Sequence, residues 1–89
     1  MNEKIISLNK LPIGCIGKVK KITACGNKRR RMLDLGLING TLVKSLRKSP
    51  FGDPIAYEIR GAVIALREEE SSNIYIQKIE ERSIKDGFI

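Results

Sequence analysis

The sequence contains no histidine and no tryptophan, and it has only two cysteines, two phenylalanines and two tyrosines among 89 residues. Without histidine, neither a Ser-His nor a Cys-His catalytic pair can form, and no serine or cysteine lies in a G-x-S-x-G motif. A structural zinc site uses four close Cys or His ligands, which two cysteines do not supply. We therefore expect no enzymatic activity, no catalytic or metal-ligating residues and no cofactor, while weak divalent-metal binding by surface carboxylates stays open.

Long apolar runs are also absent. The stretch Ala62–Leu66 has the length of a strand, far below the roughly 20 residues of a membrane helix, and residues 1–10 lack the apolar centre of a signal peptide. Two cysteines are too few for a secreted disulfide scaffold, so Cys15 and Cys25 are predicted to be reduced, partly buried thiols. These features together predict a cytoplasmic protein.

Negative charge is scarce, because 17 Lys and Arg residues against 10 Asp and Glu residues give a formal net charge of +7. This excess favours an anionic partner: nucleic acid, an acidic protein surface or the cytoplasmic face of a membrane. Four successive cations at residues 28–31 would spread around a helix, and both a solvated face and an electrostatic docking patch stay open for them. The shortage of aromatic side chains disfavours single-stranded nucleic acid as the partner.

The residues that are present predict a mostly β domain. Glycine and proline separate short apolar runs, and strands are predicted at residues 15–22, 41–48, 55–59, 63–66 and 74–79, with a bulge between Val19 and Ile22. The slip between Val19 and Ile22 fits a strand end as well as a bulge. Turns are predicted at Asn39-Gly40 and at Gly61, and one helical turn at residues 68–70. The expected fold is a closed, SH3-like antiparallel β-barrel with one or two short helices.

One helix is predicted at residues 27–35, with Asn27 as its N-cap and Gly36 as its left-handed C-terminal residue. Leu33 is expected in the core, since a helix would plug one open end of the barrel. Gly17 is expected to relieve crowding inside it. With room for only one core, the domain should cover residues 1–79 and leave a polar C-terminal tail at 80–89.

Four motifs follow one another in a characteristic order: Leu11-Pro12-Ile13-Gly14 with Gly17, Arg31-Met32-Leu33-Asp34-Leu35-Gly36-Leu37 with Gly40, Pro50-Phe51-Gly52-Asp53-Pro54, and Ala65-Leu66-Arg67 before an acidic turn. This series resembles the FeoA family of ferrous iron transport proteins over roughly residues 5–79. The resemblance implies an SH3-like barrel. It also implies a cytosolic accessory protein of bacterial ferrous iron uptake that acts with the membrane permease FeoB, whose cytoplasmic part is a GTPase.

The domain also resembles the C-terminal SH3-like module of iron- or manganese-dependent transcriptional repressors, which is attached to a DNA-binding domain. Because no such domain precedes it here, we expect the transport accessory. The alternative function is a nucleic-acid or anionic-surface binding module related to those repressor domains. No small-molecule substrate is expected, nucleic acid is the less favoured partner, and weak self-association stays open.

The resemblance implies a partner-binding surface made of the helix end and the proline-rich loop. Its residues are Arg30, Arg31, Leu35, Gly36 and Leu37, together with Pro50, Phe51, Gly52, Asp53 and Pro54. The loop has a second interpretation, since residues 50–54 would also fix a β-hairpin. Both interpretations stay open at this point.

Overall fold

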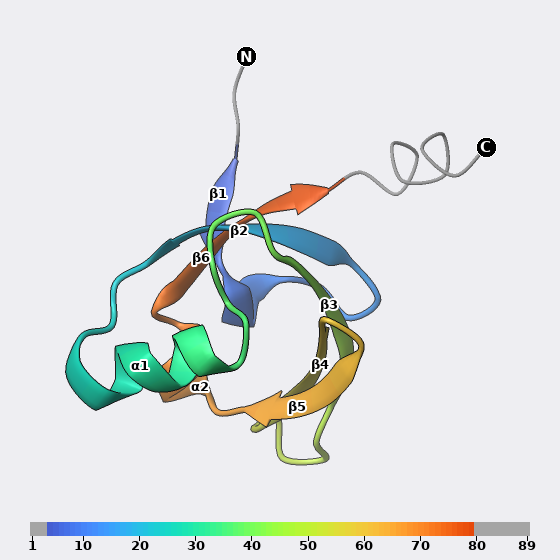
Figure 1. Ribbon diagram of the computed structural model, residues 1–89. Helices are drawn as coiled ribbons and strands as arrows, with labels where there is room; N and C mark the ends of the chain where they lie inside the picture. The colour runs from blue at the N-terminus through green and yellow to red at the C-terminus, as the bar shows by residue number, and fades with distance from the viewer. Residues whose placement is uncertain (1–3, 80–89) are drawn as a thin grey trace.

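The computed structural model describes residues 4–79. Six antiparallel strands form one sheet in the order β1-β6-β2-β3-β4-β5, which curls around a single core (Figure 1). The strands are β1 Ile5–Ser7, β2 Ile16–Ile22, β3 Leu42–Lys48, β4 Ile55–Ile59, β5 Ala62–Leu66 and β6 Ile74–Ile79, and the helical segments are η1 Leu8–Lys10, α1 Gly26–Asp34 and α2 Glu68–Ser71. The mostly β class is confirmed. The tail predicted at 80–89 lies outside the described residues.

The sheet has two edges, so the prediction of a closed barrel is wrong. Within residues 4–79, β1 pairs only with β6 and β5 only with β4. β1 was not predicted at all, because three residues are too few to show an alternating pattern. The chain turns into η1 directly after Ser7, so β1 is too short to continue along β5 and complete a barrel.

The core lies inside the curled sheet and follows the predicted alternation. Along β4, Ile55, Tyr57 and Ile59 are buried, as the sequence pattern indicated. Among the described residues, the other fully buried apolar side chains are Leu8, Val19, Leu37, Val43, Leu66, Ile74 and Ile76. At Gly17 an added Cβ would lie 2.6 Å from the Cδ1 atom of Ile76, which confirms the predicted crowding at this glycine.

Two predicted irregularities of the backbone are also present. The register between β2 and β6 shifts between Val19 and Lys21, at the position of the predicted bulge. The β4–β5 turn has positive φ at both Arg60 and Gly61, of 52° and 85°. Two successive residues of this kind make the tight hairpin turn whose twist matches the flanking strands.

α1 differs from its prediction at its start and in its buried face. The N-cap is Cys25, not Asn27, and no side chain caps the first turn. Met32 is the buried residue of the helix, whereas Leu33 is 41% exposed, so its placement in the core was wrong. Successive helical residues point about 100° apart, and Met32 and Leu35 take the inward face instead. Both thiols are free, with Cys15 half-buried and Cys25 exposed rather than buried.

Candidate functional site

Three of the predicted site residues, Leu35, Gly36 and Leu37, form the C-terminal end of α1 and anchor the helix to the core. The N–H of Leu37 donates to the carbonyl of Met32 at 3.0 Å, and the N–H of Gly36 donates to that of Leu33 at 2.9 Å. This is the Schellman ending, for which Gly36 supplies the positive φ of 94°. Leu37 is fully buried and Leu35 packs against the core. These residues therefore fix the position of the exposed cations on α1.

The proline-rich loop is held in one shape by its own hydrogen bonds and presents an aromatic ring at its tip. Ser49 donates from its N–H to the Pro54 carbonyl at 3.1 Å and from its hydroxyl to the Asp53 carbonyl at 2.8 Å. The Gly52 N–H donates to the Ser49 carbonyl at 2.8 Å. Phe51 packs against almost nothing, since 96% of it is exposed.

Asp53 fastens this loop to the start of α2. Its Oδ1 accepts from the backbone N–H of Glu68 at 2.9 Å, and its Oδ2 lies 3.7 Å from the Nη1 of Arg67. The first N–H groups of a helix have no partner within the helix, so a carboxylate there satisfies one of them. The loop and α2 thus form one connected unit.

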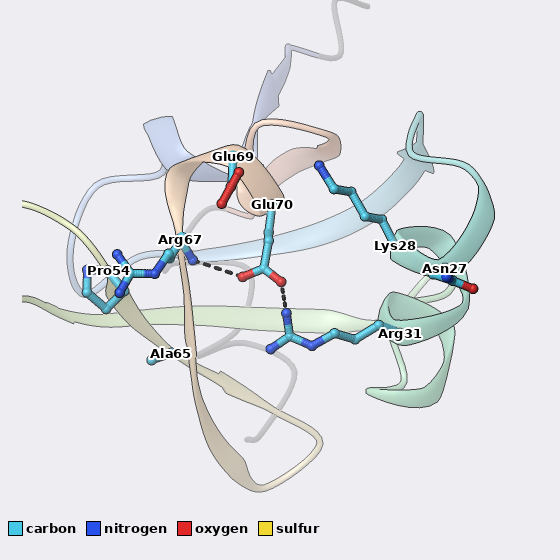
Figure 2. Close-up of a pocket in the computed structure, with 8 residues that line it drawn as sticks. All are labelled: Asn27, Lys28, Arg31, Pro54, Ala65, Arg67, Glu69 and Glu70. Atoms are coloured by element: carbon cyan, nitrogen blue, oxygen red, sulfur yellow. Dashed lines mark hydrogen bonds and ion pairs between the residues drawn. The ribbon is translucent and has the colours of Figure 1, made fainter.

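Glu70 in turn connects α2 to α1. Its Oε1 accepts from the backbone N–H of Arg67 at 3.1 Å, and its Oε2 pairs with the guanidinium of Arg31 on α1 (Figure 2). One carboxylate therefore both caps α2 and holds the neighbouring helix. The two predicted site segments, which residues 38–49 separate in sequence, are linked by four side chains that we call the polar bridge: Asp53, Arg67, Glu70 and Arg31.

An open hollow of about 570 Å³ lies over the polar bridge. Figure 2 shows α1 on one side of it and Pro54 on the other, with α2 between them. We call it the docking hollow, and its lining residues are Asn27, Lys28, Arg31, Pro54, Ala65, Arg67, Glu69 and Glu70. Of the ten predicted site residues, only Arg31 and Pro54 line it.

The acidic turn was the part of the site that sequence reasoning missed. Residues 68–70 were predicted as a helical turn with no part in the partner-binding surface, whereas Glu70 bonds to both Arg67 and Arg31. One signal was available, because a glutamate three residues after a helix-capping position often accepts from the cap's backbone N–H. The pairing with Arg31 had no such signal, since it depends on how α1 packs in three dimensions.

The four cations at residues 28–31 have different surroundings. Arg31 belongs to the polar bridge, and Arg29 donates to the carbonyl of Ile22 at 3.4 Å. Lys28 and Arg30 are exposed and form no ion pair within residues 4–79. Across the same residues, no group of three or more Cys, Asp or Glu side chains is placed to hold a metal ion, and no helix is long and apolar enough to cross a membrane.

Two solved structures that share less than 25% sequence identity with this chain show its fold. The zinc-complexed FeoA of Stenotrophomonas maltophilia, described as an SH3 domain protein, is 24% identical with a TM-score of 0.73, over 81% of this chain and 89% of that one. A manganese-dependent transcriptional repressor is 19% identical with a TM-score of 0.78, over 89% of this chain and 44% of the repressor. The SH3-like fold and the likeness to such repressors are thereby confirmed.

Two further proteins with FeoA or Fe(2+) transport protein A in their names share more of the sequence. The NMR structure of the FeoA-like protein from Clostridium acetobutylicum is 36% identical with a TM-score of 0.81, over 91% of this chain and 93% of that one. The Fe(2+) transport protein A/Fe(2+) transporter FeoB fusion protein of Porphyromonas gingivalis is 26% identical over 72 residues. Those residues are 81% of this chain and only 8% of the fusion protein.

The family assignment follows from the extent of the match along the chain. The FeoA domain pattern matches residues 6–78, which begin in β1 and end in β6. The match therefore includes α1, the proline-rich loop, α2 and the docking hollow between them. The chain belongs to the FeoA domain family.

Proposed function

We propose that this protein is a cytosolic accessory protein of bacterial ferrous iron uptake, and that it docks onto the cytoplasmic GTPase region of the permease FeoB. Membership in the FeoA family supports the pathway. The fusion protein of Porphyromonas gingivalis supports the partner, because its name joins a FeoA unit to a FeoB transporter in one chain. Two modules on one chain meet at a high effective concentration, which favours units that work in contact.

Phe51 is the single observation that carries the docking proposal. An aromatic side chain that is 96% exposed contributes nothing to the core, yet the loop that bears it is held by three internal hydrogen bonds and by Asp53. Because the backbone of the loop is already fixed, little conformational freedom is lost when a partner buries the aromatic side chain. Phe51 is therefore suited to be the anchor that inserts into an apolar pocket of the partner.

The cations of α1 define the partner surface further. The loop that ends at Pro54 leads directly into the docking hollow, whose other wall carries Lys28. Arg30 on α1 is exposed as well. Both cations are free of ion pairs among the described residues, so a partner carrying an apolar pocket next to carboxylates would complement this side of the molecule.

The proposal is tested by titrating the isolated cytoplasmic GTPase region of FeoB with wild-type protein and with Phe51→Ala. We expect saturable binding that weakens about thirtyfold in the variant, because truncation of an anchor residue costs about 2 kcal/mol. Phe51→Ala should fold normally, since the ring has almost no contacts within the protein. Isothermal calorimetry measures the affinity and circular dichroism checks the fold.

The matched control is Ile13→Ala, which also removes an exposed apolar side chain, 46% exposed and on the connection between η1 and β2. This variant should bind with unchanged affinity. Equal weakening by both substitutions would show that Phe51 is not an anchor. Absence of binding by the folded wild-type protein would overturn direct association with the GTPase region.

A further inference from the structure

Charge is distributed unevenly over the described part of the molecule. Within residues 4–79, the acidic residues are Asp34, Asp53, Glu58, Glu68, Glu69 and Glu70. None lies between residues 4 and 33 or between 71 and 79. The adjacent strands β1, β6 and β2 therefore carry no acidic side chain, while β2 and β6 carry four lysines.

The strand register gathers several of these lysines on the outer face of the sheet. Directly paired residues of antiparallel strands point to the same face. Lys18 is paired with Gln77, which is paired with Ile5, and on its other side Lys18 is paired with Leu42. Ile5 and Leu42 are 42% and 52% exposed. One row across β1, β6, β2 and β3 therefore combines a lysine with two exposed aliphatic side chains.

The neighbouring positions add more positive charge. Lys44 on β3 is exposed and paired with Ile16, one row away from Lys18. On the other side, the bulge in β2 allows the successive residues Lys20 and Lys21 to line one hollow together with Ile5. We call Ile5, Lys18, Lys20, Lys21, Leu42 and Lys44 the lysine face. Within residues 4–79 none of its lysines forms an ion pair, and Glu58, paired with Lys44, marks its border.

We propose that the lysine face binds the anionic phospholipid surface of a membrane. Lysine ammonium groups are attracted to anionic lipid headgroups, and each contributes roughly a fivefold gain in binding near such a surface. Their long aliphatic stems lie along apolar surface while the charge stays in water. The exposed Ile5 and Leu42 would enter the headgroup region between them.

A lipid surface fits this face better than nucleic acid does. All the cations of the lysine face are lysines, which lack the planar fork with which arginine reads guanine or grips a phosphate at two points. Among the described residues a single aromatic side chain, Tyr75, lines the hollow with Ile5, Lys20 and Lys21, whereas proteins that bind unpaired bases stack successive bases on several aromatic rings. Exposed aliphatic groups between lysines instead match a surface that is charged outside and apolar beneath.

This site goes beyond the proposed docking to FeoB and uses a different side of the molecule. In Figure 1, β1, β6 and β2 run across the top, and α1 and α2 lie below them. Attachment through the lysine face would leave the docking hollow uncovered. The two contacts can therefore be tested separately.

The test is co-sedimentation of the full chain with phosphatidylcholine vesicles, with and without phosphatidylglycerol, at low and at moderate ionic strength. We expect binding only to the vesicles with phosphatidylglycerol, and weaker binding as salt is added. Lys18→Gln together with Lys21→Gln should weaken it by about 25-fold, from two lysine contributions. The matched control, Lys28→Gln together with Arg30→Gln, removes the same net charge from α1 and should retain most of the binding.

A third variant separates lipid from other polyanions. Leu42→Gln should weaken vesicle binding without changing its salt dependence. The matched control, Val63→Gln, replaces an exposed aliphatic side chain on β5, beyond the border at Glu58, and should leave vesicle binding unchanged. Equal losses in the lysine variant and its α1 control would overturn the lysine face as the site. Binding to duplex DNA that exceeds vesicle binding at the same salt, and that is lost in the lysine variant, would assign the face to nucleic acid instead.

Discussion

Gly17 occupies a position in β2 where the neighbouring strand leaves no room for a side chain. An added Cβ would lie 2.6 Å from the Cδ1 atom of Ile76 and 3.2 Å from its Cβ and Cγ1 atoms. Ile76 is itself fully buried, so its side chain cannot turn away freely. Overpacking of this kind costs about 1–3 kcal/mol, while replacing a strand glycine by alanine gains roughly 0.5–1 kcal/mol. Crowding should therefore outweigh the gain.

We expect Gly17→Ala to lower the free energy of unfolding by about 1–2 kcal/mol, measured by urea denaturation. Ile76→Val removes the Cδ1 atom that the new methyl group would meet. The double variant should then lose less stability than the sum of the two single variants, because contacting residues do not act independently. Strictly additive losses would show that the contact with Ile76 is not the cause.

Tyr57 introduces a dependence of stability on alkaline pH. Burial of the side chain raises the pKa of its hydroxyl above the ordinary value of 10.0, since the phenolate would lose its solvation. The hydroxyl donates to the Leu8 carbonyl at 3.5 Å. As the pH rises past 10, the unfolded chain releases this proton while the folded protein keeps it, so the stabilisation present at lower pH is progressively lost.

The measurement is the free energy of unfolding between neutral pH and about pH 11, for wild-type protein and Tyr57→Phe. The wild-type protein should lose stability more steeply above pH 10. Near neutral pH the variant should differ by less than about 1 kcal/mol, because the lost hydrogen bond is long. Parallel pH profiles for the two proteins would refute the role of Tyr57.

At the scale of the element, α2 has only four residues, yet it connects the proline-rich loop to α1. Asp53 joins it to the proline-rich loop and Arg31 joins it to α1. A single helical turn is unstable by itself, because the cost of nucleation is not repaid by so few hydrogen bonds. The carboxylates of Asp53 and Glu70 supply partners from outside the helix, and the turn is stable for that reason.

The two roles of Glu70 can be separated by substitution. Glu70→Gln keeps an oxygen for the Arg67 N–H but removes the charge that faces Arg31, and we expect a loss of about 0.5 kcal/mol that shrinks at high salt. Glu70→Ala removes the cap as well and should cost about 1–2 kcal/mol. Chemical denaturation at two salt concentrations measures both values.

The matched control is Glu69→Gln, since Glu69 lines the docking hollow and forms no ion pair within residues 4–79. Its stability should stay within about 0.5 kcal/mol of wild type, as is usual for surface positions. Equal losses for Glu70→Gln and Glu70→Ala would rule out the capping contribution. An equal loss for Glu69→Gln would rule out a specific pair with Arg31.

Individual elements were predictable to the extent that their signals are local. The strand β4 and the bulge in β2 follow from alternation along the chain, and Gly36 was placed correctly because a helix end needs a residue with positive φ. The start of α1 was misplaced because Asn27 is a good cap by type, whereas the structure begins the helix after Cys25. Whether Met32 or Leu33 faces the core depends on how α1 packs against the sheet, and so Leu33 was assigned wrongly.

At the scale of the whole molecule, the sequence predicted the mostly β class and the family but not the open sheet. Closure depends on whether the two edge strands, β1 and β5, meet, and no local pattern encodes that contact. The candidate site was predicted in two separate pieces for the same reason. The polar bridge exists only because the packing of α1 brings Arg31 to Glu70.

The uneven distribution of charge described above also gives the described part of the molecule, residues 4–79, an electric dipole. Apart from Asp34 at the end of the cationic helix α1, the described acidic residues lie on α2, β4 and the proline-rich loop, away from the strands β1, β6 and β2. Any negatively charged surface therefore exerts a torque on the protein before contact and turns its lysine-bearing strands forward. Orientation during diffusion would raise the rate of productive encounters, and this kinetic advantage would fade as added salt shortens the range of the field.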